Sequence, residues 1–268
     1  IGIPLDDRTL ENLRNAVVLS FSGPVCLPLN RQSIGEEPIN FLPHNLREAL
    51  HALFALVKFR NDTWALDTSE KMIADILDLW SPHTGWNLEP FSNLGIHFWE
   101  SEGFLHGEGR MIGPLAKYWK HTGYIPALKL AIMLKEKALQ DFFLEDGSYE
   151  ARRFITRHTH SITSTMSSLA ILADVLGDLS LLLRIKAFFD HGLWEMRDEI
   201  GWAPEYVQQE NSDHGEANNT GDILETALIL GKWGFTACYQ DAERILRCHL
   251  LPCQLRDTSF IKEPTNPK

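Results

Sequence analysis

Residues 201–216, GWAPEYVQQENSDHGE, combine carboxylates with aromatic side chains and lack the spacing of a helix. Hydrolysis of a glycosidic bond needs two carboxyl groups, one to protonate the leaving oxygen and one to act as nucleophile or base. We assign these catalytic roles to Glu205 and Glu216. Trp202 and Tyr206 offer flat apolar surfaces on which sugar rings can pack. The segment therefore predicts a carbohydrate site.

Polar residues also stand directly before four predicted helices, at the same phase of a repeat. Five of them are explained by helix capping, namely Asn45, Ser161, Asn219, Thr220 and Asp222. Capping does not explain the histidines and carboxylates beside them, so we expect one shared pocket. The residues that we expect to bind substrate there are His106, Glu108, Arg110, His158, His160, Trp202, Tyr206, Asp213 and His214.

Two short motifs raise the question of a metal. His158-Thr159-His160 places two imidazoles close together, and Asp213-His214-x-Glu216 adds carboxylates, so zinc or another divalent ion can be imagined. Neither spacing is diagnostic of a metal site. We therefore expect no cofactor, with the histidines binding substrate hydroxyls or transferring protons.

The elements that must position these residues are helical hairpins. An amphipathic stretch, a turn and a second amphipathic stretch recur in residues 109–143, 161–196 and 222–255, with turn glycines about 55 residues apart. An earlier copy spans 46–79 and has Asn61-Asp62 at its turn. Such a period belongs to stacked helical hairpins.

The connections between hairpins are long and polar, whereas the turns within them are short. This asymmetry favours an all-α toroid of the (α/α)6 type, complete or incomplete, whose long loops gather at one rim. We expect an N-terminal helix and irregular segment at 1–43, the toroid at 44–257 and a polar tail at 258–268. The helix of the first segment is expected at 10–19.

Composition excludes some classes of partner. The formal charge of −11 at pH 7 argues against nucleic acid or an anionic membrane as the main partner. The chain has no run of 18 apolar residues, and its start lacks the pattern of a signal peptide. We expect a carbohydrate partner and a protein that is soluble, while localisation and oligomeric state stay open.

The runs GRMIGPLAKYWKHTGY, HTHSITSTMSSLA and HGEANNTGDILETALILGKWG resemble, in their order, the bacterial β-L-arabinofuranosidases of glycoside hydrolase family 127. The resemblance covers about residues 110–255 and implies an (α/α)6 toroid that acts on a plant or microbial glycoside. It also implies a zinc ion held by a Glu-x-Cys motif and a later Cys-Cys pair. Glu216 matches the glutamate, but Asn218 stands where the cysteine is expected and the chain ends before the later pair. Glu205 is, by order, the candidate for the family's general acid.

Two alternatives of other kinds remain open. One is a uronate-directed polysaccharide lyase or a sugar epimerase, in which histidine with tyrosine would abstract a proton beside a carboxylate or carbonyl. Such a lyase needs a basic subsite, which could be provided by Arg110, Arg152, Arg153 and Arg157. The other is a toroid that binds sugar without catalysis.

Overall fold

The computed structural model describes residues 6–33, 35–154, 156–208, 214–257 and 259–260. Asp213 and most of the expected tail at 258–268 lie outside the described residues. The division into a segment at 1–43, a toroid at 44–257 and a tail stays a prediction. The N-terminal helix that the sequence predicts at 10–19 is found as α1, Asp7–Ser20.

The four predicted hairpins are present. Their helices are α2 (Leu46–Arg60) with α3 (Thr63–Leu79), α6 (Ile112–Thr122) with α7 (Ile125–Asp141), α8 (Thr159–Leu176) with α9 (Leu179–Asp190), and α10 (Ala217–Lys232) with α11 (Ala237–Ile245). A single π-helical turn, Leu246–Leu250, extends α11. The chain is thus built of repeated helical pairs, as predicted.

The turns form where the sequence places residues that tolerate a left-handed backbone. Gly123 and Gly177 end α6 and α8 with φ of 76° and 71°. Asn61 does the same after α2, with φ of 50°. The next residue, Asp62, begins α3 and accepts a hydrogen bond from the backbone N–H of Ala65 at 3.1 Å. These features reverse the chain within a few residues.

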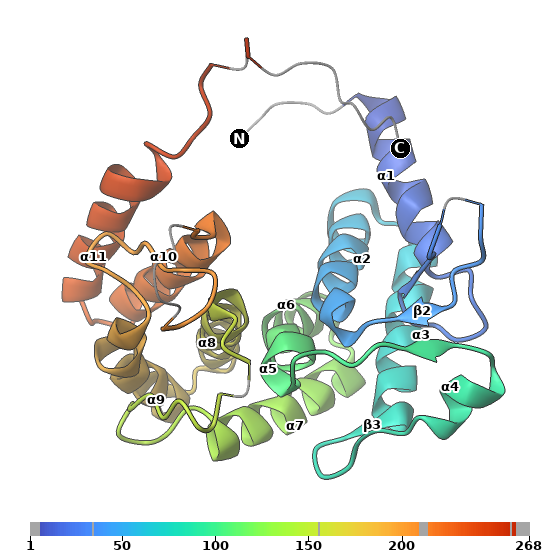
Figure 1. The fold of residues 1–268 in the computed structure, drawn as a ribbon, viewed down its shortest axis with the longest axis horizontal. Helices are drawn as coiled ribbons and strands as arrows, with labels where there is room; N and C mark the ends of the chain where they lie inside the picture. Colours follow the sequence, from blue (N-terminus) through green and yellow to red (C-terminus); the bar gives the residue numbers. More distant parts are fainter. Residues whose placement is uncertain (1–5, 34, 155, 209–213, 258, 261–268) are drawn as a thin grey trace.

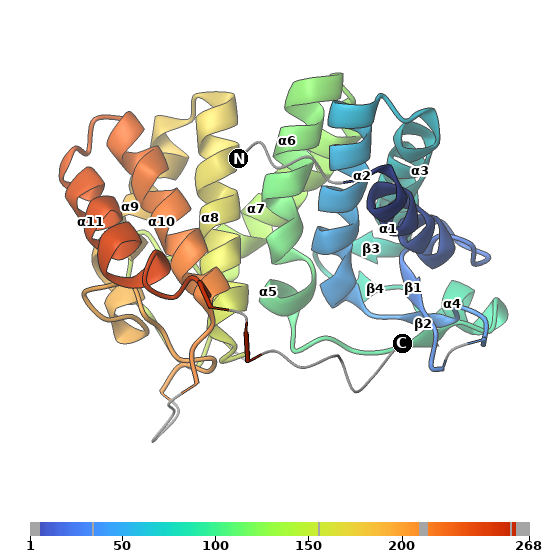
Figure 2. The ribbon, with the colours of Figure 1, turned by 90° about the horizontal axis from the view of Figure 1, so that it is seen from above.

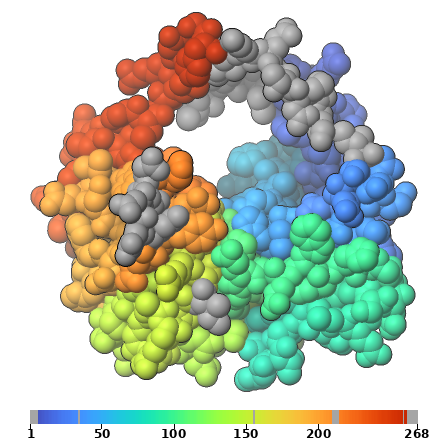
Figure 3. Space-filling view, in the orientation of Figure 1, coloured from blue at the N-terminus to red at the C-terminus, as the bar shows by residue number. Residues whose placement is uncertain are grey.

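The hairpins form an α/α toroid in which α2, α6, α8 and α10 lie inside and α3, α7, α9 and α11 lie outside (Figure 1). Figure 3 shows the opening that the helices surround. One apolar core runs between the inner and outer layers and includes Leu53, Leu115 and Leu169, which are fully buried. The all-α toroid that the sequence predicts is therefore confirmed.

Short elements fill the connectors. These are β1 (Leu29–Asn30), β2 (Asn40–Phe41), β3 (Trp80–Ser81), β4 (Gly85–Trp86), α4 (Glu89–Asn93), β5 (His97–Phe98) and α5 (Phe104–Gly107). β2 pairs antiparallel with β1 and parallel with β5, while β3 and β4 form a separate antiparallel pair. Each strand has two residues, so these sheets brace the connectors rather than form a layer. Within the described residues, no helix has the length and apolar character needed to cross a membrane.

Candidate functional site

The N-terminal ends of the inner helices meet at one rim of the ring, where α5 also lies (Figure 2). His44 belongs to a 3-10 turn before α2, and His106 belongs to α5 before α6. His158 is the residue before α8, and Glu216 is the residue before α10. Polar residues from four separate segments therefore face a common region, as the repeat predicts.

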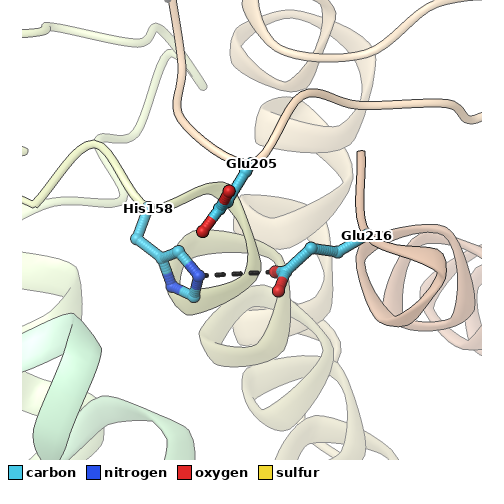
Figure 4. A group of neighbouring side chains, drawn as sticks. All are labelled: His158, Glu205 and Glu216. Carbon is cyan, nitrogen blue, oxygen red and sulfur yellow. Dashed lines mark ion pairs between the residues drawn. The ribbon is translucent and has the colours of Figure 1, made fainter. Parts of the chain in front are cut away.

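The two proposed catalytic carboxylates come together around His158 (Figure 4). His158, Glu205 and Glu216 each offer one atom within 4.8 Å of the others. The Nε2 atom of His158 lies 3.3 Å from Oε2 of Glu216. Its Nδ1 atom lies 2.9 Å from the hydroxyl of Ser161, which fixes the plane of the imidazole. Glu205 and Glu216, from the two ends of one connector, thus meet at one imidazole.

Backbone hydrogen bonds hold Glu205 in this position. Its carbonyl accepts from the N–H of Thr159 at 2.8 Å, and its N–H donates to the carbonyl of His214 at 3.0 Å. Tyr206 forms a β-bridge with His158, and the two rings lie 5.5 Å apart. These backbone hydrogen bonds on both sides of Glu205, which we call the clamp, tie its position to the start of α8 and to the segment before α10.

Glycine is required beside this clamp. A Cβ at Gly215 would lie 2.5 Å from the indole Nε1 of Trp202, so the tryptophan packs directly on the glycine backbone. Trp202 also receives support from Asp198, whose carboxylate accepts the backbone N–H of Trp202 at 2.9 Å. Trp202 is half-buried and lies in the same connector as Glu205 and Glu216. It is thus held rigidly next to the residues before α10.

Four imidazoles form a chain of ring contacts through the site. The ring centroids lie 4.4 Å apart for His44 and His106, 5.4 Å for His106 and His158, and 6.0 Å for His158 and His160. Burial is the main cause that lowers the pKa of His106 to about 4, and the neighbouring His44 and His158 act in the same direction. Burial and the Arg110 guanidinium lower the pKa of His160 to about 2. Both rings are therefore neutral at pH 7 and bring no positive charge.

Asp222 is a buried carboxyl group of this site. Its Oδ2 accepts a hydrogen bond from Thr163 at 3.1 Å and lies 3.5 Å from Nε2 of His160. Its Oδ1 lies 3.8 Å from a guanidinium nitrogen of Arg47. Burial raises the pKa of Asp222 to about 7, against the opposing effect of Arg47. The Asp222 side chain thus links α10 to α8 and does not cap a helix end.

The capping interpretation of Ser161, Asn219, Thr220 and Asp222 is therefore wrong. The helices begin earlier than the sequence suggests, with His158 and Glu216 in the extended backbone of the N-cap position. Asn45 does occupy the N-cap position of α2, but its side chain makes no capping hydrogen bond. Asn219 and Thr220 are fully buried inside α10. Their polar side chains form contacts between segments, such as the hydrogen bond that Thr220 donates to the carbonyl of Gly201.

Arg110 carries unused hydrogen-bonding capacity at the site. Its side chain is 1% exposed, and Nη2 donates to Oε1 of Glu48 at 3.0 Å. Its Nε and Nη1 atoms are buried without an acceptor. Glu48 also pairs with Arg47 at 3.1 Å. Neither Arg47 nor Glu48 is among the residues predicted from the sequence, although both follow His44 within one helical turn, and Asp222 is predicted there only as a capping residue.

Glu108 makes its side-chain hydrogen bond outside this network. Glu108 is 4% exposed and accepts a hydrogen bond from the indole of Trp86, and burial raises its pKa to about 7. His214 is exposed and contributes its backbone carbonyl to Glu205. Asp213 lies outside the described residues. The substrate-binding roles of Glu108, His214 and Asp213 stay predictions.

The group within the described residues that could hold a metal is His158, Glu205 and Glu216. It contains no cysteine, and Asn218 donates from its amide to Nδ1 of His160 at 3.0 Å. A thiolate zinc site of the kind implied by the family resemblance does not fit these residues. A hard divalent cation would find one imidazole and two carboxylates here.

Comparison with known proteins gives matches in structure. No protein-family model and no curated protein matches the sequence. A family 76 α-1,6-mannanase from Salegentibacter sp. HEL1_6, solved as an inactive variant with α-1,6-mannotetrose, aligns with a TM-score of 0.65. The two chains are 15% identical over 92% of this chain and 72% of that one.

Two further structures have the same architecture. A family 76 glycoside hydrolase (mannosidase) from Bacteroides thetaiotaomicron VPI-5482 aligns with a TM-score of 0.62 at 12% identity, over 90% of this chain and 71% of that chain. A sugar epimerase from a ruminal bacterium aligns with a TM-score of 0.60 at 13% identity, over 91% of this chain and 69% of that chain. These likenesses establish the shared fold.

Proposed function

We propose that this protein is a glycoside hydrolase that uses Glu205 and Glu216 as its catalytic carboxylates. The observation that carries the proposal is their convergence with His158, with one atom of each within 4.8 Å of the others. Retaining glycosidases hold their two carboxyl groups about 5–5.5 Å apart, whereas inverting enzymes leave about 6.5–9.5 Å for a water molecule. Carboxylates whose nearest oxygens lie within 4.8 Å leave little room for a water molecule between them, and we therefore propose a retaining reaction.

We assign the nucleophile to Glu216 and the general acid to Glu205. Nδ1 of His158 contacts the hydroxyl of Ser161, and its Nε2 lies 3.3 Å from Oε2 of Glu216, so the fixed imidazole positions this carboxylate for attack. In the first step Glu216 bonds to the anomeric carbon, the glycosidic C–O bond breaks, and Glu205 gives its proton to the leaving oxygen. Water then releases the sugar, Glu205 recovers a proton from that water, and Glu216 is free again.

An uncharged sugar fits the surrounding charges best. The guanidinium groups of Arg47 and Arg110 are paired with Glu48, and Arg47 also faces Asp222, whose raised pKa leaves it partly protonated at pH 7. With Glu205 as the acid and Glu216 as the nucleophile, positive and negative charges nearly balance, and the neutral His106 and His160 add none. A sugar hydroxyl can accept from the free N–H groups of Arg110 and donate to a carboxylate. A uronate would find no excess of positive charge here, so the site lacks the basic subsite that the uronate lyase needs.

The structural neighbours support the reaction class but not its residues. The mannanase is an inactive variant in which two consecutive aspartates are replaced by alanine. The consecutive aspartates of this chain are Asp6 and Asp7, at the start of α1, where Asp6 caps the helix through Thr9. We therefore place the chemistry on Glu205 and Glu216 and propose that it proceeds without a metal. The resemblance to family 127 adds arabinofuranosides to the substrates that should be tested.

The test compares Glu205→Gln and Glu216→Gln with the parent on a panel of nitrophenyl glycosides that includes mannosides, arabinofuranosides and galactosides. Each variant should lose on the order of 10³-fold in kcat, because a carboxyl group that acts in the transition state is removed. Glu199→Gln is the matched control, since Glu199 is an exposed glutamate just before the same connector. Undiminished rates in both variants would refute the assignment, and loss of activity with EDTA would refute the metal-free reaction. Binding without any product would instead favour a sugar-binding toroid.

A sugar epimerase is the second candidate. The contacts of His44, His106 and His158 place three imidazoles in series, which suits proton removal and return on a sugar carbon. One structural neighbour is a sugar epimerase. Epimerisation in D₂O would introduce deuterium at the carbon beside the carbonyl of a reducing sugar, and hydrolysis would not.

A further inference from the structure

A second cleft lies on the outside of the ring, between α9 and α11. It has a volume of about 400 Å³ and is lined by α9, the turn after it (Gly192–Glu195) and α11. Both helices belong to the outer layer, on the left side of Figure 1. This cleft is thus separate from the site at the inner helices, and nothing in the proposed reaction uses it.

Arg197 forms the floor of the cleft. Its guanidinium lies 4.0 Å from the ring centroid of Trp194 and 5.2 Å from that of Phe189, so two aromatic rings hold it. Nη2 donates to Oδ2 of Asp241 at 2.8 Å, and Nη1 donates to the carbonyl of Asp198 at 3.4 Å. Nε is buried and has no acceptor, and the side chain as a whole is 1% exposed. Arg197 therefore keeps one N–H donor without a partner at this place.

The walls offer surfaces of the kind that sugars use. Trp194 is 44% exposed even though Arg197 stacks on it, so part of its indole remains open to a ligand. Arg244 donates to Asp241, the same carboxylate that binds Arg197. Lys186 pairs with Asp190 at the edge of the cleft. The cleft combines an open aromatic surface with ion pairs that can accept and donate further hydrogen bonds.

The arrangement of charges favours an uncharged ligand. Three cationic groups, Lys186, Arg197 and Arg244, share two carboxylates, Asp190 and Asp241, so every cation has a partner and the excess is one positive charge. An anion would compete with these carboxylates, whereas hydroxyl groups can add to the ion pairs as donors and acceptors at once. A neutral, hydroxyl-rich chain with an apolar ring face matches both the ion pairs and Trp194.

We propose that this cleft is a second carbohydrate-binding site that holds a neutral glycan chain outside the catalytic site, with Trp194 as its stacking platform and Arg197 as a hydrogen-bond donor. The connector that starts at Arg197 carries Glu205 into the active site at the rim. A polysaccharide held in the cleft is thereby kept near the site, and its effective concentration there rises. Small substrates gain nothing from the cleft.

The test uses affinity gel electrophoresis of the Glu205→Gln, Glu216→Gln double variant in gels containing yeast mannan, arabinan or mixed-linkage glucan. At least one polysaccharide should retard the protein, and adding Trp194→Ala should weaken that binding by about tenfold. Phe59→Ala is the matched control, because Phe59 is an aromatic residue of α2 that is 72% exposed. Retardation that Trp194→Ala leaves unchanged, or no retardation in any gel, would overturn the proposal.

A second readout separates this site from the proposed function. In the otherwise unaltered protein, Trp194→Ala should keep full turnover of nitrophenyl glycosides and lose about tenfold in kcat/KM on the retained polysaccharide. Equal losses on small and polymeric substrates would contradict a separate site. Retardation that depends on Trp194 in a protein that cleaves no glycoside would keep the second site and refute the hydrolase.

Discussion

Asp222 is predicted to carry a proton in the folded protein near neutral pH, and this can be tested through stability. Burial raises its pKa to about 7, compared with an ordinary value of 3.8. Between these values the folded state binds a proton that the unfolded state does not, so this group stabilises the fold increasingly as pH falls from about 7 toward 4. The slope is about 1.4 kcal/mol per pH unit for one proton.

The perturbation is Asp222→Asn, which keeps the size of the side chain and removes the titration. The neutral histidines of the site also make stability depend on pH, but they are shared by parent and variant. The unfolding free energy of the parent minus that of the variant should therefore be more positive at pH 5 than at pH 8, by about 3 kcal/mol. That figure is the slope multiplied by the two pH units from 7 down to 5.

Urea unfolding followed by tryptophan fluorescence at pH 5 and pH 8 measures these free energies. Asp67→Asn is the control, because Asp67 is exposed on α3 and its replacement should have the same effect at both pH values. If Asp222→Asn changes stability equally at pH 5 and pH 8, then Asp222 is ionised in the folded state. The opposing influence of Arg47 would then outweigh burial, and the reasoning would be refuted.

Three further outcomes are expected. His160→Gln should reduce the loss of stability between pH 6.5 and pH 5 by about 2 kcal/mol, because the folded state keeps this imidazole neutral while the unfolded chain protonates it; an unchanged loss in urea titrations would contradict this. Gly147→Ala should lower stability by more than about 3 kcal/mol, because φ is +71° and the new Cβ would lie 2.2 Å from the backbone of Ala187. Gly123→Ala, with φ of +76° and no atom within 4 Å, should lose only about 1 kcal/mol, and equal shifts in thermal melts would argue against the clash. Glu48→Gln should raise the affinity for a glucuronide relative to the matching glucoside by about tenfold in calorimetry, since one repelling charge is removed, and an unchanged ratio would contradict the charge argument.

The sequence predicts the hairpins because their signals are local. Gly123, Gly177 and Asn61 reverse the chain where the apolar periodicity breaks, and each adopts the left-handed backbone expected there. The convergence of polar residues on one rim was also predictable, since it follows from the phase of the repeat. The sequence predicts that Glu205 and Glu216 act together, but it does not predict how close their carboxylates lie.

Other features depend on contacts between distant segments. Asp222 resembles a capping residue in sequence, and its contacts with Thr163 and His160 on α8 make it a buried site group. Glu108 resembles a site residue, yet the packing of Trp86 determines where its carboxylate lies. Family 127 was suggested by the order of short runs, and the comparisons show the fold rather than that family. No local pattern contains this information, because the partner lies tens of residues away.

The clamp around Glu205 has a consequence for how activity should be lost. His158 begins the third hairpin, Glu216 begins the fourth, and the backbone of Glu205 is hydrogen-bonded to the residues next to both. No single hairpin carries all of His158, Glu205 and Glu216, so a ring in which one of these hairpins has unfolded should be inactive. Separation of α8 from α10 would abolish turnover before much helix is lost. Catalysis would thus report the docking of two neighbouring hairpins, and inactivation on heating should precede the loss of helical circular dichroism.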